Sequence, residues 1–537
     1  MPIETGAETA ERGAETLLSD ASPEIYRQNA FRVTGLHVDA TGREVSRQVQ
    51  ELKIRERLGG ASAAGAGALA LDPPPDQHAV QEALHRLRDP ERRLVDELFW
   101  FWPRRLGDGA RDRSLAALAR GQVEAATAMW IGQEGSVSDG HVAAHNLAVL
   151  AHASALDLDH AGRAGSLSED ERALRDTLWP QALGRWEALL HRDGFWDRLA
   201  ERVRSLDDPR LRTGTVEALR RSLPLALLLI NARLAAQRAE AGDLAEVARQ
   251  VRLIRESRFG ERWVEEALHL ATAGLRDRLR LLCKAAEDEA GTRPERAHEM
   301  ARRLLDQTRP LLAALDLLLR EEDEVRRGAH DQVALRVLSC QIAYGNRTDD
   351  WETSLALLNE AGGIAVGATA SGRLGENVRI VQDNLEHDRE YGTCFFCGDA
   401  PPAAEVAVEV KLHGEVVRVP VPGGVQIRWR SLTAKVPRCP ACKEAQVRLA
   451  ASTGVGGVLG GLAGVGGCFA TMESDTGWLS VVLAIVLLSV GLGLGRFVGR
   501  RGAKTGIRGE GEASQFPPVR RLLAEGWSVG EKPADAN

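Results

Sequence analysis

Four of the seven cysteines in the chain form two Cys-x-x-Cys pairs, Cys394 with Cys397 and Cys439 with Cys442. Two residues between cysteines let both thiolates reach one ion, and four thiolates complete the closed tetrahedral site of a structural Zn²⁺. Such pairs fit a reducing compartment with bound metal better than disulfides. A redox pair, unrelated free thiols or an iron–sulfur cluster on the same ligands are the alternatives. The sequence therefore predicts a structural Zn²⁺ site at these four residues.

The segment between the two pairs has the alternation of short β-strands. Apolar residues alternate with polar or small ones in residues 406–412, 417–421 and 426–430. We expect His413-Gly414 to turn the chain between the first two of these strands. With a knuckle at each end, residues 392–447 resemble a zinc ribbon, in which two metal knuckles close a small antiparallel sheet.

A second candidate for metal chemistry is the pair His141 and His145, which stand one helical turn apart. An open catalytic zinc also needs a third ligand and a nearby base, and the sequence around the pair supplies neither. No phosphate-binding loop, nucleophile elbow or paired-carboxylate motif stands out in the chain. We therefore predict no catalytic residues, with a zinc-dependent enzyme as the weaker alternative and packed or partly exposed histidines as the ordinary interpretation.

Length and composition indicate a globular protein of several domains. The 537 residues are 44% hydrophobic and 27% charged, and the formal net charge is −7. This balance gives no basic surface for nucleic acid. The abundance of Ala, Arg, Leu and Gly suggests a bacterial source with a GC-rich genome. The polar first residues carry no signal-peptide pattern, and we expect residues 1–22 to be a disordered leader.

Residues 449–472 and 476–495, near the end of the chain, carry no charged residue. Each stretch is long enough for a transmembrane helix, and we predict these helices at residues 449–472 and 476–496. The basic residues that flank them predict a hairpin in the inner or cell membrane, with both termini and the bulk of the chain in the cytosol. Glycines recur at every fourth position, so these helices could pair with each other or between chains in a homo-oligomer. The alternative is a glycine-rich stretch that is buried or flexible in a soluble protein.

Residues 103–391 have the apolar periodicity of α-helices almost throughout. Two places, residues 123–130 with 141–150 and residues 334–344 with 351–361, look like degenerate tetratricopeptide-type (TPR-like) helix pairs. The period is irregular, so we predict an α-helical repeat-like array. Helix breaks are expected at Pro180, Pro209, Asp243, Gly260, Pro294 and Gly345.

The four adjacent aromatic residues 99–102 cannot all lie on one side of a helix. We interpret them as a packing junction between the first helices and the array, with a partner-binding hot spot as the alternative.

Residues 23–102 carry helix signals in a characteristic order. A short helix is expected at residues 29–36, Thr41 and Glu44 form a capping box for a helix from Gly42, and Asp89-Pro90 begins another helix. The second helix has a basic face made of Arg43, Arg47, Lys53, Arg55 and Arg57.

This order resembles a J-domain, the co-chaperone module of the DnaJ family. The resemblance implies an Hsp70 as partner and the basic face as its docking surface. The family's His-Pro-Asp tripeptide, which stimulates the Hsp70 ATPase, does not occur in this chain. The basic face could dock an acidic partner in another way, or it is a solvated helix face.

Together these features predict a mainly α fold with a J-like helical domain, a TPR-like array, a small β zinc ribbon and two transmembrane helices. In the tail, residues 502–537, a short amphipathic helix could lie on the membrane surface or pack back on the ribbon. The predicted function is a membrane-anchored cytosolic scaffold or chaperone-like protein that binds protein partners and has no catalytic chemistry of its own. An Hsp70 co-chaperone that uses a non-standard contact is the first alternative.

Overall fold

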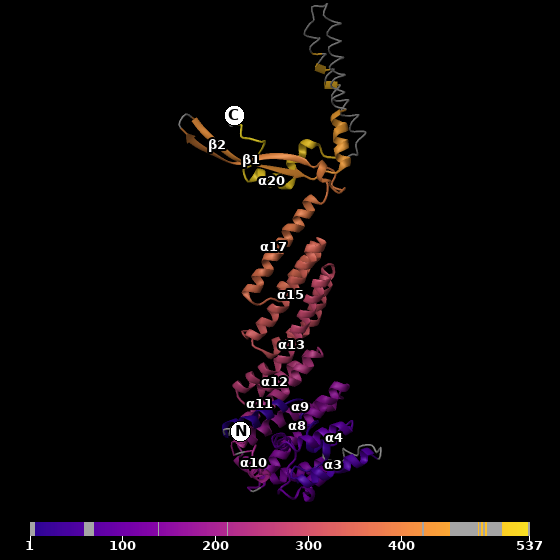
Figure 1. Ribbon diagram of the computed structural model, residues 1–537, viewed down its shortest axis with the longest axis vertical. Helices are drawn as coiled ribbons and strands as arrows, with labels where there is room; N and C mark the ends of the chain where they lie inside the picture. Colours follow the sequence, from indigo (N-terminus) through magenta and orange to yellow (C-terminus); the bar gives the residue numbers. More distant parts are fainter. Residues whose placement is uncertain are drawn as a thin grey trace, which may run out of the picture. The chain divides into compact units, whose positions relative to one another are not determined.

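The computed structural model describes residues 6–57, 69–137, 139–211, 213–421, 424–451 and 507–534, together with residues 482, 485–486 and 489–490. The chain divides into two compact units (Figure 1). The first unit comprises Met1–Thr348 and Glu360–Leu374, and the second comprises Asp349–Asn359 and Gly375–Asn537.

The described part of the first unit is helical. Its helices are α1 (Gly6–Asp20), α2 (Ala30–Thr34), α3 (Gly42–Arg57), α4 (Gln77–Arg86), α5 (Pro90–Leu98), α6 (Arg113–Ala119), α7 (Val123–Glu134), α8 (Gly140–Ala164), α9 (Glu169–Leu190), α10 (Asp193–Leu206), α11 (Thr213–Glu240), α12 (Leu244–Glu256), α13 (Glu261–Thr292), α14 (Ala297–Leu318) and α15 (Glu324–Thr348), with 3₁₀ turns η1 (Gly109–Arg111) and η2 (Pro294–Arg296). Two further helices, α16 (Trp351–Gly362) and α17 (Ala368–Tyr391), contribute residues to both units.

The first helix stands where a disordered leader was expected. Helix α1 packs against α11, and Leu17 is fully buried. A Cβ on Gly13 would lie only 3.0 Å from Cγ2 of Thr215, which shows how closely the two helices approach. The polar composition of this segment did not predict the packing, because a helix needs only a narrow apolar stripe to pack against another helix.

Short polar side chains begin the next helices, as the sequence predicts. Oδ1 of Asn29 accepts hydrogen bonds from the backbone N–H groups of the first turn of α2. Thr41 and Glu44 exchange the two hydrogen bonds of the predicted capping box at 3.3 and 2.7 Å. Asp76 and Asp89 cap α4 and α5, because each side chain accepts hydrogen bonds from backbone N–H groups in the first turn of its helix.

The aromatic residues 99–102 form the predicted junction, which confirms that interpretation. All four side chains are at most 4% exposed. The ring centroid of Phe99 lies 5.5 Å from that of Trp186, and the ring of Phe101 stacks on Trp130. Trp102 packs beside Phe195. The cluster therefore joins the end of α5 to α7, α9 and α10.

Helices that follow one another in the chain pack together through the rest of the unit. Helix α7 contacts α8, α8 contacts α9, α11 contacts α12 and α13, and α14 contacts both α13 and α15. The likeness to tetratricopeptide-type repeats stays a prediction. Two expected breaks are wrong, because Pro180 lies inside α9 and Gly345 inside α15. Pro180 is exposed, so the carbonyl that loses its helical hydrogen bond can bind water.

The second unit contains a small antiparallel sheet (Figure 1). Strands β1 (Val408–Val421) and β2 (Gly424–Val436) form a long hairpin, in which Val408 faces Val436 and Val421 faces Gly424. The short strand β3 (Ser528–Val529) pairs with the other edge of β1. The short 3₁₀ turn η3 (Ala404–Val406) precedes β1. The sheet order is β2-β1-β3.

The expected turn at His413-Gly414 is wrong. Strand β1 continues past these residues with an irregular register between Gly414 and Val417, and the chain reverses only after Val421. Gly414 serves a different purpose, because a Cβ there would lie 2.6 Å from Cδ2 of Trp527. The glycine makes room for an indole from the end of the chain, and no local pattern could reveal that contact.

The tail packs on the sheet. Of the two predicted positions for its short helix, the membrane surface and the ribbon, the structure has the second. It forms the 3₁₀ turn η4 (Glu510–Gln515) and helix α20 (Pro517–Ala524). Phe516 and Val519 join the buried core that also contains Phe396 and Leu412. The guanidinium of Arg521 makes ion pairs of 2.7 Å with Glu386 and Glu390 on α17.

The two transmembrane helices of the predicted fold, and the membrane location that rested on them, require correction. Among the described residues, no helix combines the length and apolar character needed to cross a bilayer. Most of residues 449–472 and 476–496 lies outside the described residues. An apolar run does not by itself specify a continuous helix, because each interior glycine costs about 1 kcal/mol relative to alanine. The structure thus has a mainly α fold with one small sheet. The predicted contact with lipid and the predicted pairing of membrane helices between chains are therefore not proposed.

Candidate metal centre

The first knuckle follows directly after α17. Cys394 donates its backbone N–H to the carbonyl of Ala400 at 2.9 Å, and Gly398 donates to the carbonyl of Cys394 at 2.7 Å. Gly398 has φ +73°, in the left-handed region that favours glycine. This tight turn brings the Cys394 and Cys397 thiols to one side of the loop.

The second knuckle follows β2 and includes the first turn of a helical segment over residues 440–451. The backbone N–H of Cys442 donates to Sγ of Cys439 at 3.4 Å, as expected where amides support a thiolate. Phe395 donates its N–H to the carbonyl of Pro437 at 2.9 Å, so the two knuckles are bonded to each other through their backbones.

The structure brings all four predicted cysteines together. Their Sγ atoms lie within 4.8 Å of one another. Four thiolates around a single Zn²⁺ at about 2.3 Å would stand about 3.8 Å apart, so the tetrad needs only a small contraction. Cys397 is the most exposed of the four, whereas the other three are buried. In the described parts of the chain, this is the one cluster of three or more potential ligands that could hold a metal ion.

The surroundings of the four cysteines shift the pKa values of their thiols in different directions. Burial raises the pKa of Cys394, and burial together with the neighbouring thiols raises the pKa of Cys442. Burial also opposes ionisation of Cys397, but hydrogen bonds from the backbone of Ala400 and Asp399 outweigh it and lower the pKa to about 7. Four thiolates so close together repel one another, so a bound cation is needed for all four to ionise.

A polar network that sequence reasoning missed supports the centre. The buried Arg438 donates from Nε to the carbonyl of Val406 at 2.5 Å and from Nη1 to Oε1 of Gln446 at 2.9 Å. Gln446 donates in turn to the carbonyl of Arg508 at 3.0 Å, and the Arg508 guanidinium lies 4.5 Å above the ring of Phe395. The tail thus lies against both knuckles. The position of the tail depends on contacts between distant segments, so no local pattern could predict it.

The alternative histidine site does not assemble. His145 is fully buried and stacks on Phe195. Its Nε2–H donates to the carbonyl of Leu98 at 2.7 Å, and Nδ1 has no partner. Burial lowers its pKa to about 4. His141 is only partly buried, and in the described structure the two rings share no third ligand. His145 is a neutral core residue.

The predicted basic face lies on α3. Arg43 and Arg47 are exposed, and neither forms an ion pair with any residue in the part of the chain that the structure describes. Lys53, Arg55 and Arg57 belong to the same helix, but their side chains lie outside the described ones.

Comparisons with known proteins found no match to this chain among family models, curated proteins or solved structures.

Proposed function

We propose that this protein is a non-catalytic protein-interaction scaffold, in which a structural Zn²⁺ on Cys394, Cys397, Cys439 and Cys442 holds the second unit together. The close approach of the four Sγ atoms, within 4.8 Å, carries the proposal. An all-thiolate tetrahedral set suits Zn²⁺. A multinuclear iron–sulfur cluster holds its thiolates further apart than a single ion does, so this spacing favours one ion.

A structural role follows from the surroundings of the tetrad. Four protein ligands leave no open position for substrate or water, in contrast to the three-ligand sites of catalytic zinc. A sheet of two long strands and one short strand has too small a core for independent stability. Metal binding contributes directly to folding in such units, and the ion would fix the hairpin, the knuckles and the tail relative to one another.

The interaction role is supported by the part of the hairpin beyond Glu415. Val417 is 55% exposed, Val425 is 60% exposed and Trp429 is 37% exposed. The strand register places Val425 and Trp429 on one face of the hairpin and Val417 on the other. Exposed apolar side chains on such an element are typical of surfaces that bind other proteins.

Metal analysis of the full-length protein, with crosslinking and mass spectrometry in the source cells, would test the proposal. We expect one zinc per chain and a set of crosslinked proteins that is lost in the variant Val417→Asp/Val425→Asp. The matched control, Ile131→Asp/Leu281→Asp, changes two exposed apolar residues of the first unit and should keep that set. A metal-dependent turnover of substrate, or an unchanged set in the hairpin variant, would reject the proposal.

An Hsp70 co-chaperone is the second candidate. It is favoured by the exposed guanidinium groups of Arg43 and Arg47, which form no ion pair with the residues that the structure describes. The measurement is the ATPase rate of an Hsp70 from the same cells. Stimulation by the wild type that disappears in Arg43→Glu/Arg47→Glu would support this function. No stimulation and no binding would leave the J-like segment as part of the scaffold.

A further inference from the structure

The loop between the aromatic junction and α6, together with the first residue of α6, carries four arginines that the sequence did not single out. Arg104, Arg105, Arg111 and Arg113 line an open pocket of about 580 Å³ on the first unit. The remaining lining comes from Asp108, Asp112, Ser114, Met129 and Gln133. We call this site the arginine pocket. Its only sequence signal is the density of arginine in residues 104–113.

Hydrogen bonds hold the loop in a defined shape. Oδ2 of Asp39 accepts from the backbone N–H groups of Gly107 and Gly109 at 2.8 and 2.9 Å. Oδ2 of Asp112 accepts from the N–H of Arg104 at 2.9 Å. A Cβ on Gly109 would lie 2.4 Å from Oδ1 of Asp39, so the loop is pressed against that carboxylate. The arginines therefore project from an ordered backbone.

Positive side chains outnumber negative ones in the lining of the arginine pocket. Arg104 pairs with Asp139 at 2.6 Å. Arg105, Arg111 and Arg113 form no ion pair with any residue in the described ranges. The Asp112 carboxylate accepts from backbone N–H groups, which are neutral, so Asp108 and Asp112 both oppose the four arginines of the lining. This local excess of positive charge occurs in a chain of net charge −7.

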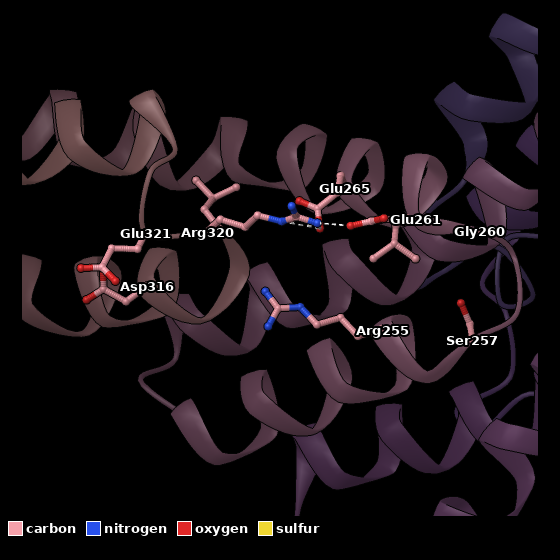
Figure 2. A pocket seen from close by; sticks show the side chains of 10 residues that line it. Arg255, Ser257, Gly260, Glu261, Glu265, Asp316, Arg320 and Glu321 are labelled. Carbon is pink, nitrogen blue, oxygen red and sulfur yellow. Dashed lines mark hydrogen bonds and ion pairs between the residues drawn. The ribbon is translucent and has the colours of Figure 1, made fainter.

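A second pocket of the same unit differs from the arginine pocket in the charges of its lining (Figure 2). It has a volume of about 610 Å³ and is lined by Arg255, Arg320 and four carboxylates. The guanidinium of Arg320 lies between Glu261 and Glu265 and pairs with both. Arg320 is therefore neutralised by its neighbours, and four carboxylates outnumber the two arginines, so this pocket has no excess of positive charge.

We propose that the arginine pocket binds a compact anion with two or more phosphate groups. Guanidinium groups bind phosphate oxygens in pairs of charge-assisted hydrogen bonds. The three guanidiniums that have no ion pair within the described ranges can together contact more than one phosphate. The volume lies in the range of small-ligand sites, about 300–1,000 Å³. The lining contains no aromatic ring on which a nucleic-acid base could stack, so the site recognises charge.

Calorimetric titration of the full-length protein with inorganic tripolyphosphate tests the proposal. We expect one site per chain, and a loss of affinity of about tenfold or more in Arg105→Gln/Arg111→Gln/Arg113→Gln, because hydrogen bonds between charged groups are strong. The control Arg172→Gln/Arg252→Gln/Arg278→Gln removes the same charge from exposed arginines elsewhere on the unit. It should bind as the wild type does. The thermal midpoint of the pocket variant should not fall, because the substitutions remove mutual repulsion.

Three results would overturn the proposal. One is the absence of binding by the wild type, and another is an equal loss in the pocket and control variants, which would indicate unspecific attraction. The third is pocket-dependent binding of a duplex oligonucleotide without binding of tripolyphosphate, which would make the loop part of a nucleic-acid surface. The variant Arg105→Lys/Arg111→Lys/Arg113→Lys separates charge from paired hydrogen bonding, and we expect an affinity below that of the wild type.

Discussion

The carboxylate of Glu97 on α5 accepts two hydrogen bonds of 2.8 Å from Nε and Nη2 of Arg202 on α10. Glu97 is fully buried, and Arg93 donates to the same carboxylate at 2.8 Å. Arg93 and Arg202 also donate to the backbone carbonyl of Val38. Residues 23–102 and the helices that follow them therefore share one buried charge network, in which the charges of either part depend on partners in the other.

Removing the shared carboxylate should destabilise the first unit strongly. We expect Glu97→Gln to lower the free energy of unfolding by about 3–5 kcal/mol, because the guanidiniums of Arg93 and Arg202 would stay buried without a full counter-charge. Urea denaturation followed by tryptophan fluorescence measures the effect. The control Glu201→Gln removes an exposed partner of Arg198 and should change stability by less than about 0.5 kcal/mol. Equal stability of the two variants would contradict the proposed importance of the network.

Loss of the metal should affect the second unit selectively. We expect Cys439→Ser, or treatment with a strong chelator, to release the ion and to open residues 394–442 to protease, because metal binding supplies folding energy to a small core. Acid should have the same effect, since the ligands must be deprotonated. Metal analysis combined with limited proteolysis checks this outcome. Cys283→Ala changes a buried cysteine outside the tetrad and should retain the metal, and unchanged protection in Cys439→Ser would refute the structural role.

The contact between Gly414 and Trp527 should be sensitive to a single methyl group. A Cβ at position 414 would lie 2.6 Å from the indole, so we expect Gly414→Ala to displace the tail and to cost about 1–3 kcal/mol. Faster proteolysis within residues 507–534 and altered tryptophan fluorescence would report the change. Gly375→Ala adds a Cβ in open space on α17 and should leave the tail protected. An unchanged proteolysis rate in Gly414→Ala would show that the ring has room to move.

The buried histidines should make the first unit sensitive to acid. Burial lowers the pKa of His152 to about 3, whereas an unfolded chain has a histidine pKa of about 6.5. The unfolded state therefore binds the proton first, and the contribution of neutral His152 to stability, complete above about pH 6.5, is lost as pH falls toward 3.

We expect His152→Leu to make the free energy of unfolding depend on pH less steeply, by about 1.4 kcal/mol per pH unit between pH 6 and 4.5. Neutral-pH stability should also fall in this variant, because the Tyr26 hydroxyl loses its partner at 3.1 Å. Denaturation curves at several pH values measure the slope. His191→Gln, at an exposed position, is the control, and an unchanged slope in His152→Leu would contradict the assignment.

The helix starts and the cysteine tetrad could be predicted because their signals are local. Asn29, Thr41 and Asp89 cap helices through bonds to backbone groups two or three residues away. Two Cys-x-x-Cys pairs predict a shared ion whatever structure the chain between them adopts. The His145 site failed for the opposite reason, because helical spacing does not tell whether a neighbouring carbonyl, here Leu98, already occupies the ring nitrogen.

The sequence by itself determined the mainly helical class, the four candidate ligands and the aromatic junction, since each depends on residue type, short spacing or local periodicity. Only the tertiary structure decided that α1 is a packed helix, that Gly414 accommodates Trp527 and that Arg202 meets Glu97. It also decided which arginines form ion pairs among the described residues. These features depend on which distant segments come together, and that choice is made by burial of the whole chain and leaves no signal in any short stretch of it.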